Sequence, residues 1–426
     1  MVTVLLMPRV RRDDVERKDE VRFTFDGEEI VAVRGEPLAS AIIAAGSLSI
    51  ARSPKFHRPR GPACFRSACD GCLARVNGSP NVMTCMAAAE GGEVVESQNT
   101  LGPRNMDLLR LTDWFFPEGF NHHELFAGVV GVQKVMQVFA RRIAGIGKLP
   151  NEPAPPRAAK RIEVDALVVG GGPSGLAIAS RLTEAGRSVW LVDDGVGFGG
   201  SAGALPGRTF EAVLSRFETI RDRVRVHLRS TIIGAFGDDL LLVTPEETLV
   251  LHARDVVVAT GAHDGVLAFE GNDLPGIMSA RAACVMLRWG VVPGSRIIVV
   301  VAEGGGPFGE AYARALKGKD AVDVRVVKGE PTKASGTSRV KSVTLASGAT
   351  HQCDAVLIDA PRAPSYELCE QLGAKVAHEP RGFVVVAENG RIREGVWAVG
   401  EVTNVPLSFA AIEADADKVF AAMNMP

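Results

Sequence analysis

The sequence of 426 residues predicts an α/β protein with a smaller α+β domain at its N-terminus. Three stretches lead to this prediction. Residues 165–193 read as a strand, a glycine turn, a helix and a second strand, and residues 295–328 repeat that order. Near the N-terminus, residues 22–33 alternate apolar and polar side chains around a turn dipeptide, as a β-hairpin does. A chain of this length is expected to form roughly two to four domains.

The composition narrows the class of protein. The formal net charge is −2 and 46% of the residues are hydrophobic, so the chain has enough apolar residues for sizeable cores and lacks the basic surplus of a nucleic-acid-binding protein. No apolar run approaches the length of a membrane span, and the N-terminal VTVLLM is too short for a signal sequence. We therefore expect a cytoplasmic protein with no nucleic-acid partner and no membrane span.

Four of the seven cysteines lie between positions 64 and 85, which argues for a metal site rather than a disulfide framework. Cys64, Cys69 and Cys72 follow the spacing C-x4-C-x2-C, and Cys85 comes after twelve intervening residues. This is the plant-type spacing for a [2Fe–2S] cluster held by four thiolates. Four cysteines also suit a structural zinc ion, although the spacing fits zinc ribbons poorly.

The residues around the cysteines predict a β-grasp domain. Asp26-Gly27 and Asn77-Gly78 are turn dipeptides, and each predicts a hairpin. Residues 38–46 read as a short buried helix that stops at its final glycine. A hairpin followed by a helix is how a β-grasp domain begins, and the second hairpin would return Cys85 to the other three cysteines.

The stretch 165–193 predicts a dinucleotide-binding βαβ unit. Gly170, Gly172 and Gly175 stand at G-x-G-x-x-G spacing after an apolar strand. The first glycine permits the tight turn, the second lets the backbone approach a pyrophosphate, and the third lets the helix pack on the strand. The helix N-terminus favours the phosphate charge, and Asp193, at the end of the next strand, suits an adenosine ribose. The alternative is a glycine-rich turn without a ligand.

Several stretches resemble one family of flavoproteins. They are RFTFDGEEI at 22–30, LASAIIAAG at 38–46, KFHRPRG at 55–61, the cysteine loop, VESQN at 95–99 and GNDLPGIMSARAA at 271–283. The family comprises the α-type subunits of hetero-oligomeric sarcosine oxidases, opine oxidases, hydrogen cyanide synthase and dye-linked proline or hydroxyproline dehydrogenases. Its sarcosine oxidase branch lacks the cluster cysteines, whereas all four are present here, so the chain is similar to the iron–sulfur branches.

The resemblance implies a two-dinucleotide-binding-domain flavoprotein of the glutathione-reductase-like kind, with FAD as the bound dinucleotide. It places Gly199-Gly200 close to the flavin and matches Thr260-Gly261 to the motif at which the chain leaves the FAD domain. It also assigns Gly400-Glu401 to the ribityl chain, with glutamate where the family usually has aspartate. The predicted FAD-binding residues are Gly170, Gly172, Pro173, Ser174, Gly175, Asp193, Gly199, Gly200, Thr260, Gly261, Gly400 and Glu401. From its position after the Thr260-Gly261 motif, His263 is the catalytic candidate.

A second glycine turn makes NAD(P), or another adenine nucleotide such as ADP or ATP, a further candidate ligand. Gly304, Gly306 and Gly309 again fit G-x-G-x-x-G after an apolar strand, but two residues intervene, and the next strand ends on Lys328 rather than an acid. Lys328 would suit the 2′-phosphate of NADP, and the alternative is a solvated lysine.

These patterns divide the chain into domains. The prediction is a β-grasp [2Fe–2S] ferredoxin-like domain over 1–100, a helical connector with a proline-rich linker over 101–160, an FAD-binding Rossmann-type domain over 161–280 and 379–426, and a second, NAD(P)-type dinucleotide-fold domain over 281–378. The three remaining cysteines, Cys284, Cys353 and Cys369, are scattered and are expected to be buried thiols without ligands.

Together with the resemblance, the two cofactors predict an electron-transfer flavoprotein. FAD takes up two electrons as hydride and a [2Fe–2S] cluster carries one at a time, so a chain with both converts one kind of transfer into the other. We expect the FAD and [2Fe–2S] subunit of a hetero-oligomeric amine or imino-acid dehydrogenase or oxidase, acting on CH–NH or CH–NH2 donors of the sarcosine, proline, hydroxyproline or opine type. Its partner would be a flavoprotein β subunit similar to D-amino-acid or sarcosine oxidases, with a further small subunit in some complexes. The alternatives are a stand-alone NAD(P)H-dependent FAD/[2Fe–2S] reductase and a scaffold that has lost its cofactors.

Overall fold

The computed structural model describes residues 19–53, 56–98, 100, 107–111, 113, 131–132, 134–135, 155–206, 210–319, 321–379 and 382–424. The predicted connector over 101–160 lies mostly outside these residues. The chain divides into two compact units: unit 1 comprises Met1–Pro153, Val266–Ala302 and Tyr312–Ile358, and unit 2 comprises Ala154–Gly265, Glu303–Ala311 and Asp359–Pro426. The predicted domain boundaries stay predictions. Within the described ranges, no helix is long and apolar enough to cross a membrane.

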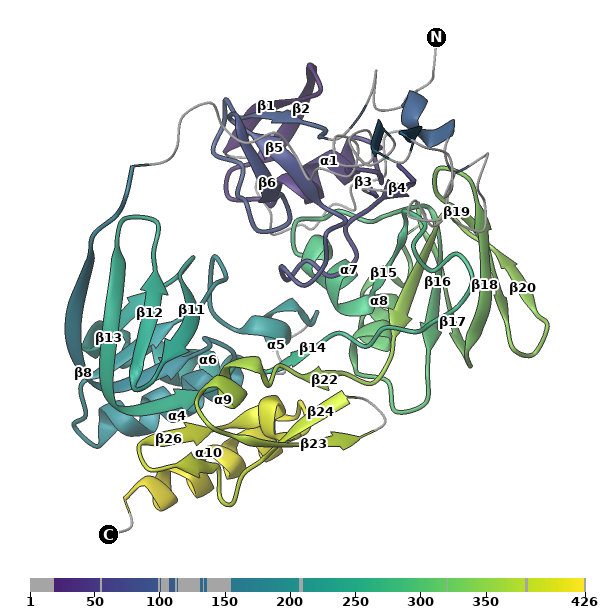
Figure 1. Ribbon diagram of the computed structural model, residues 1–426. Coiled ribbons are helices and arrows are strands. Elements are labelled where there is room, and N and C mark those ends of the chain that lie inside the picture. The colour runs from purple at the N-terminus through teal and green to yellow at the C-terminus, as the bar shows by residue number, and fades with distance from the viewer. Residues whose placement is uncertain are drawn as a thin grey trace. The chain divides into compact units, whose positions relative to one another are not determined.

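The first part of unit 1 is a five-stranded sheet with a short buried helix (Figure 1). Its strands are β1 (Glu20–Phe25), β2 (Glu28–Val33), β5 (Leu73–Val76), β6 (Ser79–Met83) and β7 (Val94–Glu96), in the order β2-β1-β7-β5-β6, with helix α1 (Leu38–Ala44) after β2. The ribbon of β3 (Ala51–Arg52) and β4 (Pro59–Arg60) and the 3-10 helix η2 (Leu108–Arg110) complete this part. Both predicted hairpins form, because Asp26-Gly27 and Asn77-Gly78 have the positive φ angles that type I′ turns require. Since β1 runs parallel to β7, the sheet is mixed, as the predicted β-grasp requires.

The second part of unit 1 is a four-stranded sheet in the order β15-β21-β16-β17. Its elements are β15 (Ile277–Ser279), α7 (Ala280–Leu287), β16 (Arg296–Val301), β17 (Asp323–Lys328) and β21 (Ala355–Asp359), together with a meander of β18 (Pro331–Gly336), β19 (Val340–Leu345) and β20 (Thr350–Gln352). Strand β15 runs parallel to β21, and β16 runs parallel to β17. Four consecutive residues of β16, 297–300, are buried, as expected for a strand covered on both faces. Helix α8 (Phe308–Leu316) follows β16 after the second glycine turn.

Unit 2 is organised around β8 (Ala159–Val169), α4 (Pro173–Glu184) and β9 (Val189–Val192), which are the predicted strand, helix and strand. The sheet continues as β10-β9-β8-β13-β12-β11, and β26 also pairs with β13. The remaining elements are α5 (Gly200–Ala204), α6 (Glu211–Glu218), η3 (Arg221–Arg223), β10 (Val224–His227), β11 (Thr231–Phe236), β12 (Asp239–Val243), β13 (Thr248–Val258), β14 (Ala262–His263), β22 (Ala363–Pro364), α9 (Glu367–Gln371), β23 (Lys375–Glu379), β24 (Gly382–Val386), β25 (Arg391–Arg393), β26 (Val396–Ala398), η4 (Gly400–Thr403) and α10 (Phe409–Met423). The first half of β13 belongs to an antiparallel meander with β12, whereas its last residues lie between β8 and β26 in parallel pairing.

Two apolar cores hold the sheet of unit 2 in place. On one face, β8 and β9 share a core with the helices α4, α6 and α10. On the other face, the alternate residues of β8 and β9 pack with the meander and with α9. Because successive side chains of a strand point to opposite faces, the apolar run at the end of β8 contributes to both cores. The cores therefore fix the carboxyl end of β8, where the first glycine turn begins.

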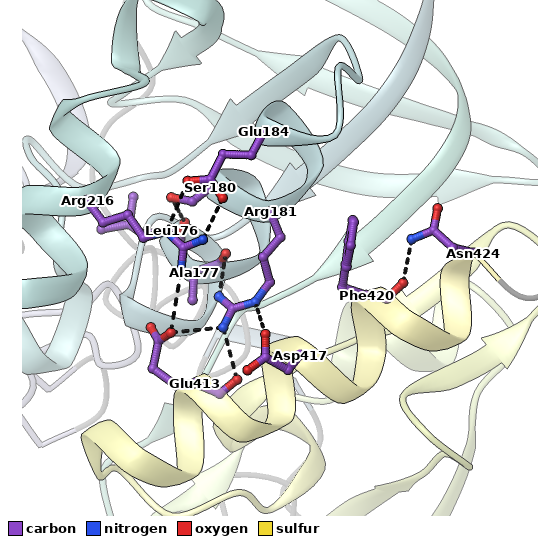
Figure 2. Close-up of polar contacts among 10 residues, drawn as sticks. All are labelled: Leu176, Ala177, Ser180, Arg181, Glu184, Arg216, Glu413, Asp417, Phe420 and Asn424. Carbon is purple, nitrogen blue, oxygen red and sulfur yellow. Dashed lines mark hydrogen bonds and ion pairs between the residues drawn. The ribbon is translucent and has the colours of Figure 1, made fainter.

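One buried arginine fastens α4 to α10 (Figure 2). Arg181 is 6% exposed; its Nε donates to Asp417 Oδ1 at 2.6 Å and its Nη2 donates to Glu413 Oε2 at 2.9 Å. On the same helix, Asp415 Oδ2 accepts the backbone amide of Gly400 at 2.8 Å. The acidic residues of the final helix thus have local partners, and they hold its position against α4 and the Gly400 turn.

Candidate cofactor sites

The four predicted cluster cysteines come together. Cys64, Cys69 and Cys72 lie in the loop between β4 and β5, and Cys85 follows β6. The Sγ atoms of Cys64 and Cys69 are 3.4 Å apart, and side-chain contacts also join Cys85 to Cys64 and to Cys72. All four are free thiols, and three of them are buried. The β5–β6 hairpin therefore does return Cys85 to the other three cysteines.

Backbone amides of the cysteine loop act on these sulfurs. Phe65 and Ser67 adopt positive φ angles of 48° and 53°, which turns the peptide groups of the loop. The backbone groups that hydrogen-bond the thiols are those of Arg66 and Ala68 for Cys64, Ala63 and Gly71 for Cys69, Cys85 for Cys72, and Ser67 for Cys85. The pKa of Cys64 is lowered mainly by its contacts with Cys69 and Cys85 and, to a smaller extent, by the amides of Arg66 and Ala68. These contacts favour its thiolate.

The arrangement of the thiols distinguishes between the two predicted metal centres. Their contacts run as an extended series, Cys69 to Cys64 to Cys85 to Cys72. In the described part of the chain, no group of three or more His, Cys, Asp or Glu side chains is close enough to hold a metal ion, and this finding favours neither centre. Two irons need an extended set of four thiolates, whereas structural zinc needs one tetrahedral centre. The donor set fits a [2Fe–2S] cluster better than zinc.

The first glycine turn leaves room for a pyrophosphate. A Cβ at Gly172 would meet no heavy atom within 4 Å, and Gly172 supplies no capping side chain to the helix that starts at Pro173. A Cβ at Gly175, by contrast, would overlap the carbonyl oxygen of Gly170, so this glycine is required by packing. The glycines thus serve the two roles expected of them, close packing and an open approach to the helix N-terminus.

Two of the other predicted FAD residues lie against this turn. Asp193 accepts the backbone amide of Gly171 at 2.5 Å through Oδ2 and that of Gly195 at 2.8 Å through Oδ1. A carboxylate has about four lone-pair sites, so it can accept more hydrogen bonds than these two. Gly199 donates its amide to the carbonyl of Gly171 at 2.9 Å and, like Gly200, has a positive φ. Hydrogen bonds therefore join the residues around 171, 193 and 199 beside the first glycine turn.

Glu401, another predicted FAD residue, is hydrogen-bonded to a buried arginine. Arg362, 9% exposed, donates from Nη1 to Glu401 Oε1 and Oε2 at 2.7 and 2.8 Å, and from Nη2 to Ser201 Oγ and the carbonyl of Ala262 at 2.7 and 2.6 Å. A Cβ at Gly261 would lie 4.0 Å from Glu401 Oε2. The glutamate that stands in place of aspartate is therefore held by a cation rather than left free.

Three further contacts complete this region. Thr260 Oγ1 donates to the carbonyl of Ser365 at 2.8 Å. A Cβ at Gly400 would overlap the side chain of Ser174, so the Gly400 turn and the start of α4 approach each other closely. His263 is hydrogen-bonded through Nε2 to Glu367 Oε1 at 2.9 Å, and its enclosed Nδ1 has no hydrogen-bond partner among the described residues.

The second glycine turn holds a carboxylate of the chain itself. The amides of Gly306 and Gly309 donate to Oδ1 and Oδ2 of Asp359 at 3.0 and 2.7 Å. Asp359 is 3% exposed, and its burial raises its pKa to about 6, although the two amides act in the opposite direction. Since this pKa is raised above the usual 3.8, the stability contributed by the protonated carboxyl is lost as the pH rises through about 6. Gly304 has a positive φ of 69°, and Lys328 at the end of β17 is exposed.

Arg362 and Asp359 were not singled out by the sequence analysis. Both follow or end the buried strand β21, whose carboxyl end is the place where α/β folds bind ligands. Charged residues at that end of an apolar strand were the available signal. The contacts themselves join residues that are far apart in sequence, so spacing does not reveal them.

Two family models match the parts of the chain in which the candidate sites lie. Residues 18–100 match the family described as "2Fe-2S iron-sulfur cluster binding domain", and residues 164–334 match the family described as "Pyridine nucleotide-disulphide oxidoreductase". These matches confirm the predicted fold class, a two-dinucleotide-binding-domain flavoprotein with an N-terminal ferredoxin-like domain. They also confirm the two predicted cofactors, FAD and a [2Fe–2S] cluster.

One of the curated relatives is a much longer protein. The chain is 31% identical over 317 residues to the sarcosine oxidase alpha subunit of Rhizobium meliloti (strain 1021), which covers 67% of this chain and 32% of that protein. It is 28% identical over 163 residues to an opine oxidase subunit of the same organism, which covers 35% of each protein. The chain therefore spans about a third of the length of the sarcosine oxidase subunit that it matches.

A solved structure shows the same fold over nearly the whole chain. The crystal structure of L-proline dehydrogenase from P. horikoshii aligns with a TM-score of 0.72 over 96% of this chain and 74% of that chain. The sequence identity is 21%, so this likeness concerns the fold.

Proposed function

Because the chain belongs to the family of α-type flavoprotein subunits that includes those of sarcosine and opine oxidases, we propose that it relays electrons from an amine- or imino-acid-oxidising partner to an acceptor. The donor would be a CH–NH or CH–NH2 compound of the sarcosine, proline, hydroxyproline or opine type, oxidised on a flavoprotein β subunit. When bound, FAD and the [2Fe–2S] cluster supply the conversion from two-electron to one-electron transfer. We further propose that this complex is cytoplasmic.

The gathering of four thiols from two separate parts of the chain carries the proposal. Cys64, Cys69, Cys72 and Cys85 would hold the cluster, and amides of residues 63–71 would hydrogen-bond its sulfurs. Such hydrogen bonds stabilise negative charge on sulfur and so set the potential at which an electron is accepted. The burial of three of the four thiols also keeps water away from the centre.

In unit 2, the predicted FAD residues would form the flavin site. Gly172 would admit the pyrophosphate, Asp193 would receive the adenosine ribose, and Glu401 would receive the ribityl chain. Arg362 fixes the Glu401 carboxylate with two hydrogen bonds, which compensates for the extra rotatable bond of glutamate compared with aspartate. His263, oriented by Glu367, is the candidate to hold or move a proton.

The isolated chain is expected to contain FAD, iron and sulfide yet to oxidise neither proline, hydroxyproline, sarcosine nor opines, because the proposed oxidation site belongs to another subunit. The measurement is dye reduction by the purified chain, beside the same assay on the untagged complex isolated from its native cells. The complex should contain a second flavoprotein and should be active with one of these compounds. Rapid amine oxidation by the chain alone would contradict the proposal.

The alternative function, a stand-alone NAD(P)H-dependent reductase, has one observation in its favour and one against. The second glycine turn, Gly304 to Gly309, has the dinucleotide spacing. However, the amides of Gly306 and Gly309 that would face a pyrophosphate already donate to Asp359. A carboxylate at this place repels the negative charge of a phosphate, and it also occupies the backbone amides that would donate to the phosphate. This contact supports the relay over the reductase.

Anaerobic NADH or NADPH is therefore expected to leave the flavin absorbance of the wild-type chain unchanged, whereas dithionite should bleach it. Replacing Asp359 by alanine frees both amides and removes the charge, so the affinity for ADP should rise by at least about tenfold. Isothermal titration of ADP into both proteins measures the change. A matched control is Asp354→Ala at the other end of β21, whose carboxylate accepts Ser295 Oγ and the amide of Arg296 and so also caps backbone. Bleaching of the wild type by NADPH within seconds would favour the reductase.

A further inference from the structure

The segment 271–283, which resembles the flavoprotein family but has no role in either predicted cofactor site, contacts the cysteine loop in unit 1. The guanidinium of Arg281 donates through Nη2 to the carbonyl oxygen of Cys64. Two residues earlier, the amide of Ser279 donates to the carbonyl of Ala63 at 2.9 Å. The carbonyl groups of Ala63 and Cys64, which are neighbours in the chain, thus accept hydrogen bonds from the end of β15 and from the first turn of α7.

The same two stretches meet at further points. Arg60 forms an ion pair with Asp273 and donates to its carbonyl at 3.2 Å. A Cβ at Gly61 would overlap the carbonyl oxygen of Leu48 and lie 3.3 Å from Pro275 Cα, so the chains approach too closely there for any side chain. The contact of Arg281 with Cys64 therefore lies within a packed junction, and the arginine has little freedom to leave it.

Arg281 brings a buried charge to this junction. Only 4% of the residue is exposed, whereas arginine is rarely buried without a structural or electrostatic reason. The Ser279 side chain caps α7 by accepting the amide of Ala282 at 3.0 Å, so the first turn that carries Arg281 is fixed as well. A guanidinium keeps its proton at any pH that the folded protein tolerates. The loop that holds Cys64 thus lies beside a permanent positive charge.

We propose that Arg281 is a positioning residue for the [2Fe–2S] cluster: it fixes the Cys64 peptide group and, by its charge, raises the reduction potential of the centre. This inference rests on the proposed ligand role of Cys64, Cys69, Cys72 and Cys85. A cluster with four thiolate ligands gains one unit of negative charge when it accepts an electron. A buried cation nearby stabilises that reduced form more than the oxidised one, because attraction grows with the charge and is weakly screened in the interior.

The four-stranded sheet of unit 1 would then have a role that needs no nucleotide. Strand β15 pairs with β21 in this sheet and leads directly into Arg281, so the position of the guanidinium depends on the sheet. The sheet would act as a rigid support for the cluster loop, and the electron affinity of the centre would depend on the integrity of that support.

The test compares midpoint potentials of the full chain, measured by anaerobic redox titration with the paramagnetic signal of the reduced cluster as readout. Arg281→Gln removes the charge and should move the midpoint to more negative values, with iron, sulfide and FAD contents unchanged. Arg281→Lys keeps the charge and should stay closer to the wild type. Arg288→Gln is the matched control: it makes the same charge change at the exposed C-cap of α7, about 10 Å further along the helix, and should leave the midpoint unchanged.

The outcomes separate the inference from the function on which it rests. If the wild type shows no paramagnetic signal and no iron, the proposed cluster function fails. If the wild type has the cluster but Arg281→Gln has the same midpoint, the positioning role of Arg281 is wrong and the function stands. Should Arg281→Gln fail to load the cluster, Arg281→Lys decides: a loaded cluster with a near-wild-type midpoint supports the role of the charge, and a midpoint shifted well below the wild type overturns it.

Discussion

Replacing Cys85 by serine is expected to abolish the [2Fe–2S] cluster while FAD remains bound. Cys85 is 4% exposed and contacts both Cys64 and Cys72, so it links the thiols of the series. Loss of this thiolate leaves three ligands for two irons and introduces a hydroxyl, which is a poor ligand for iron at neutral pH. Iron and acid-labile sulfide should fall by more than about tenfold relative to protein. The signal of the dithionite-reduced protein should disappear in parallel.

Two other cysteines of the chain serve as controls for this variant. Cys353 and Cys369 are buried thiols whose pKa values burial raises to about 12, and neither is among the predicted cluster cysteines. Cys353→Ser and Cys369→Ser should therefore keep full iron and sulfide. A Cys85→Ser protein that retains the wild-type cluster would show the ligand assignment to be wrong. Stoichiometric zinc without sulfide in the wild type would instead favour the structural zinc site.

Replacing Gly172 by valine is expected to remove FAD without unfolding the chain. Its φ of −74° and ψ of −179° are extended values that any residue adopts, and a Cβ there meets no atom within 4 Å. The new side chain would project into the space that the proposed pyrophosphate needs, and FAD affinity should fall by at least about 100-fold, or about 2.7 kcal/mol. The free energy of unfolding of the apoprotein should fall by only about 0.5–2 kcal/mol, because valine is a poorer helix N-cap residue than glycine.

Variants of two other glycines serve as comparisons for Gly172→Val. Gly175→Ala should lower both the stability of the apoprotein, by about 1–3 kcal/mol or more, and its FAD content, because the added methyl overlaps the Gly170 carbonyl. Gly197→Ala should change neither, since its Cβ would also lie in open space and its φ is ordinary. Absorbance of the bound flavin after gel filtration and denaturant unfolding of the apoproteins give the two readouts. A Gly172→Val protein that binds FAD as tightly as the wild type would exclude the turn as the phosphate site.

The sequence was most informative where a local pattern determines local structure. Asp26-Gly27 and Asn77-Gly78 predicted their hairpins because positive φ angles select those residues. The spacing of Gly170, Gly172 and Gly175 predicted the first βαβ unit for the same kind of reason. The four cysteines could be grouped because a hairpin of known length separates the third from the fourth.

The contacts that depend on topology were not predictable in this way. Glu401 was expected to face the flavin, but its partner Arg362 comes from the end of a different strand, 39 positions away. Asp359 in the second glycine turn and Arg281 beside Cys64 are similar cases, because their partners lie 50 and 217 positions away in the sequence. Periodicity and spacing describe neighbours along the chain, whereas these pairs are created by the order of strands in the sheets.

The length of β13 has a mechanical consequence. Leu249 and Leu251 belong to the part of this strand that pairs with β12 in the meander, and residues 256–258 pair with β8 and β26. Two positions beyond its end stands Thr260-Gly261, beside the paired Arg362 and Glu401. One uninterrupted strand thus connects the meander to the proposed flavin site. We expect that disturbing the meander would also strain this site, and that the two would open as a single cooperative unit.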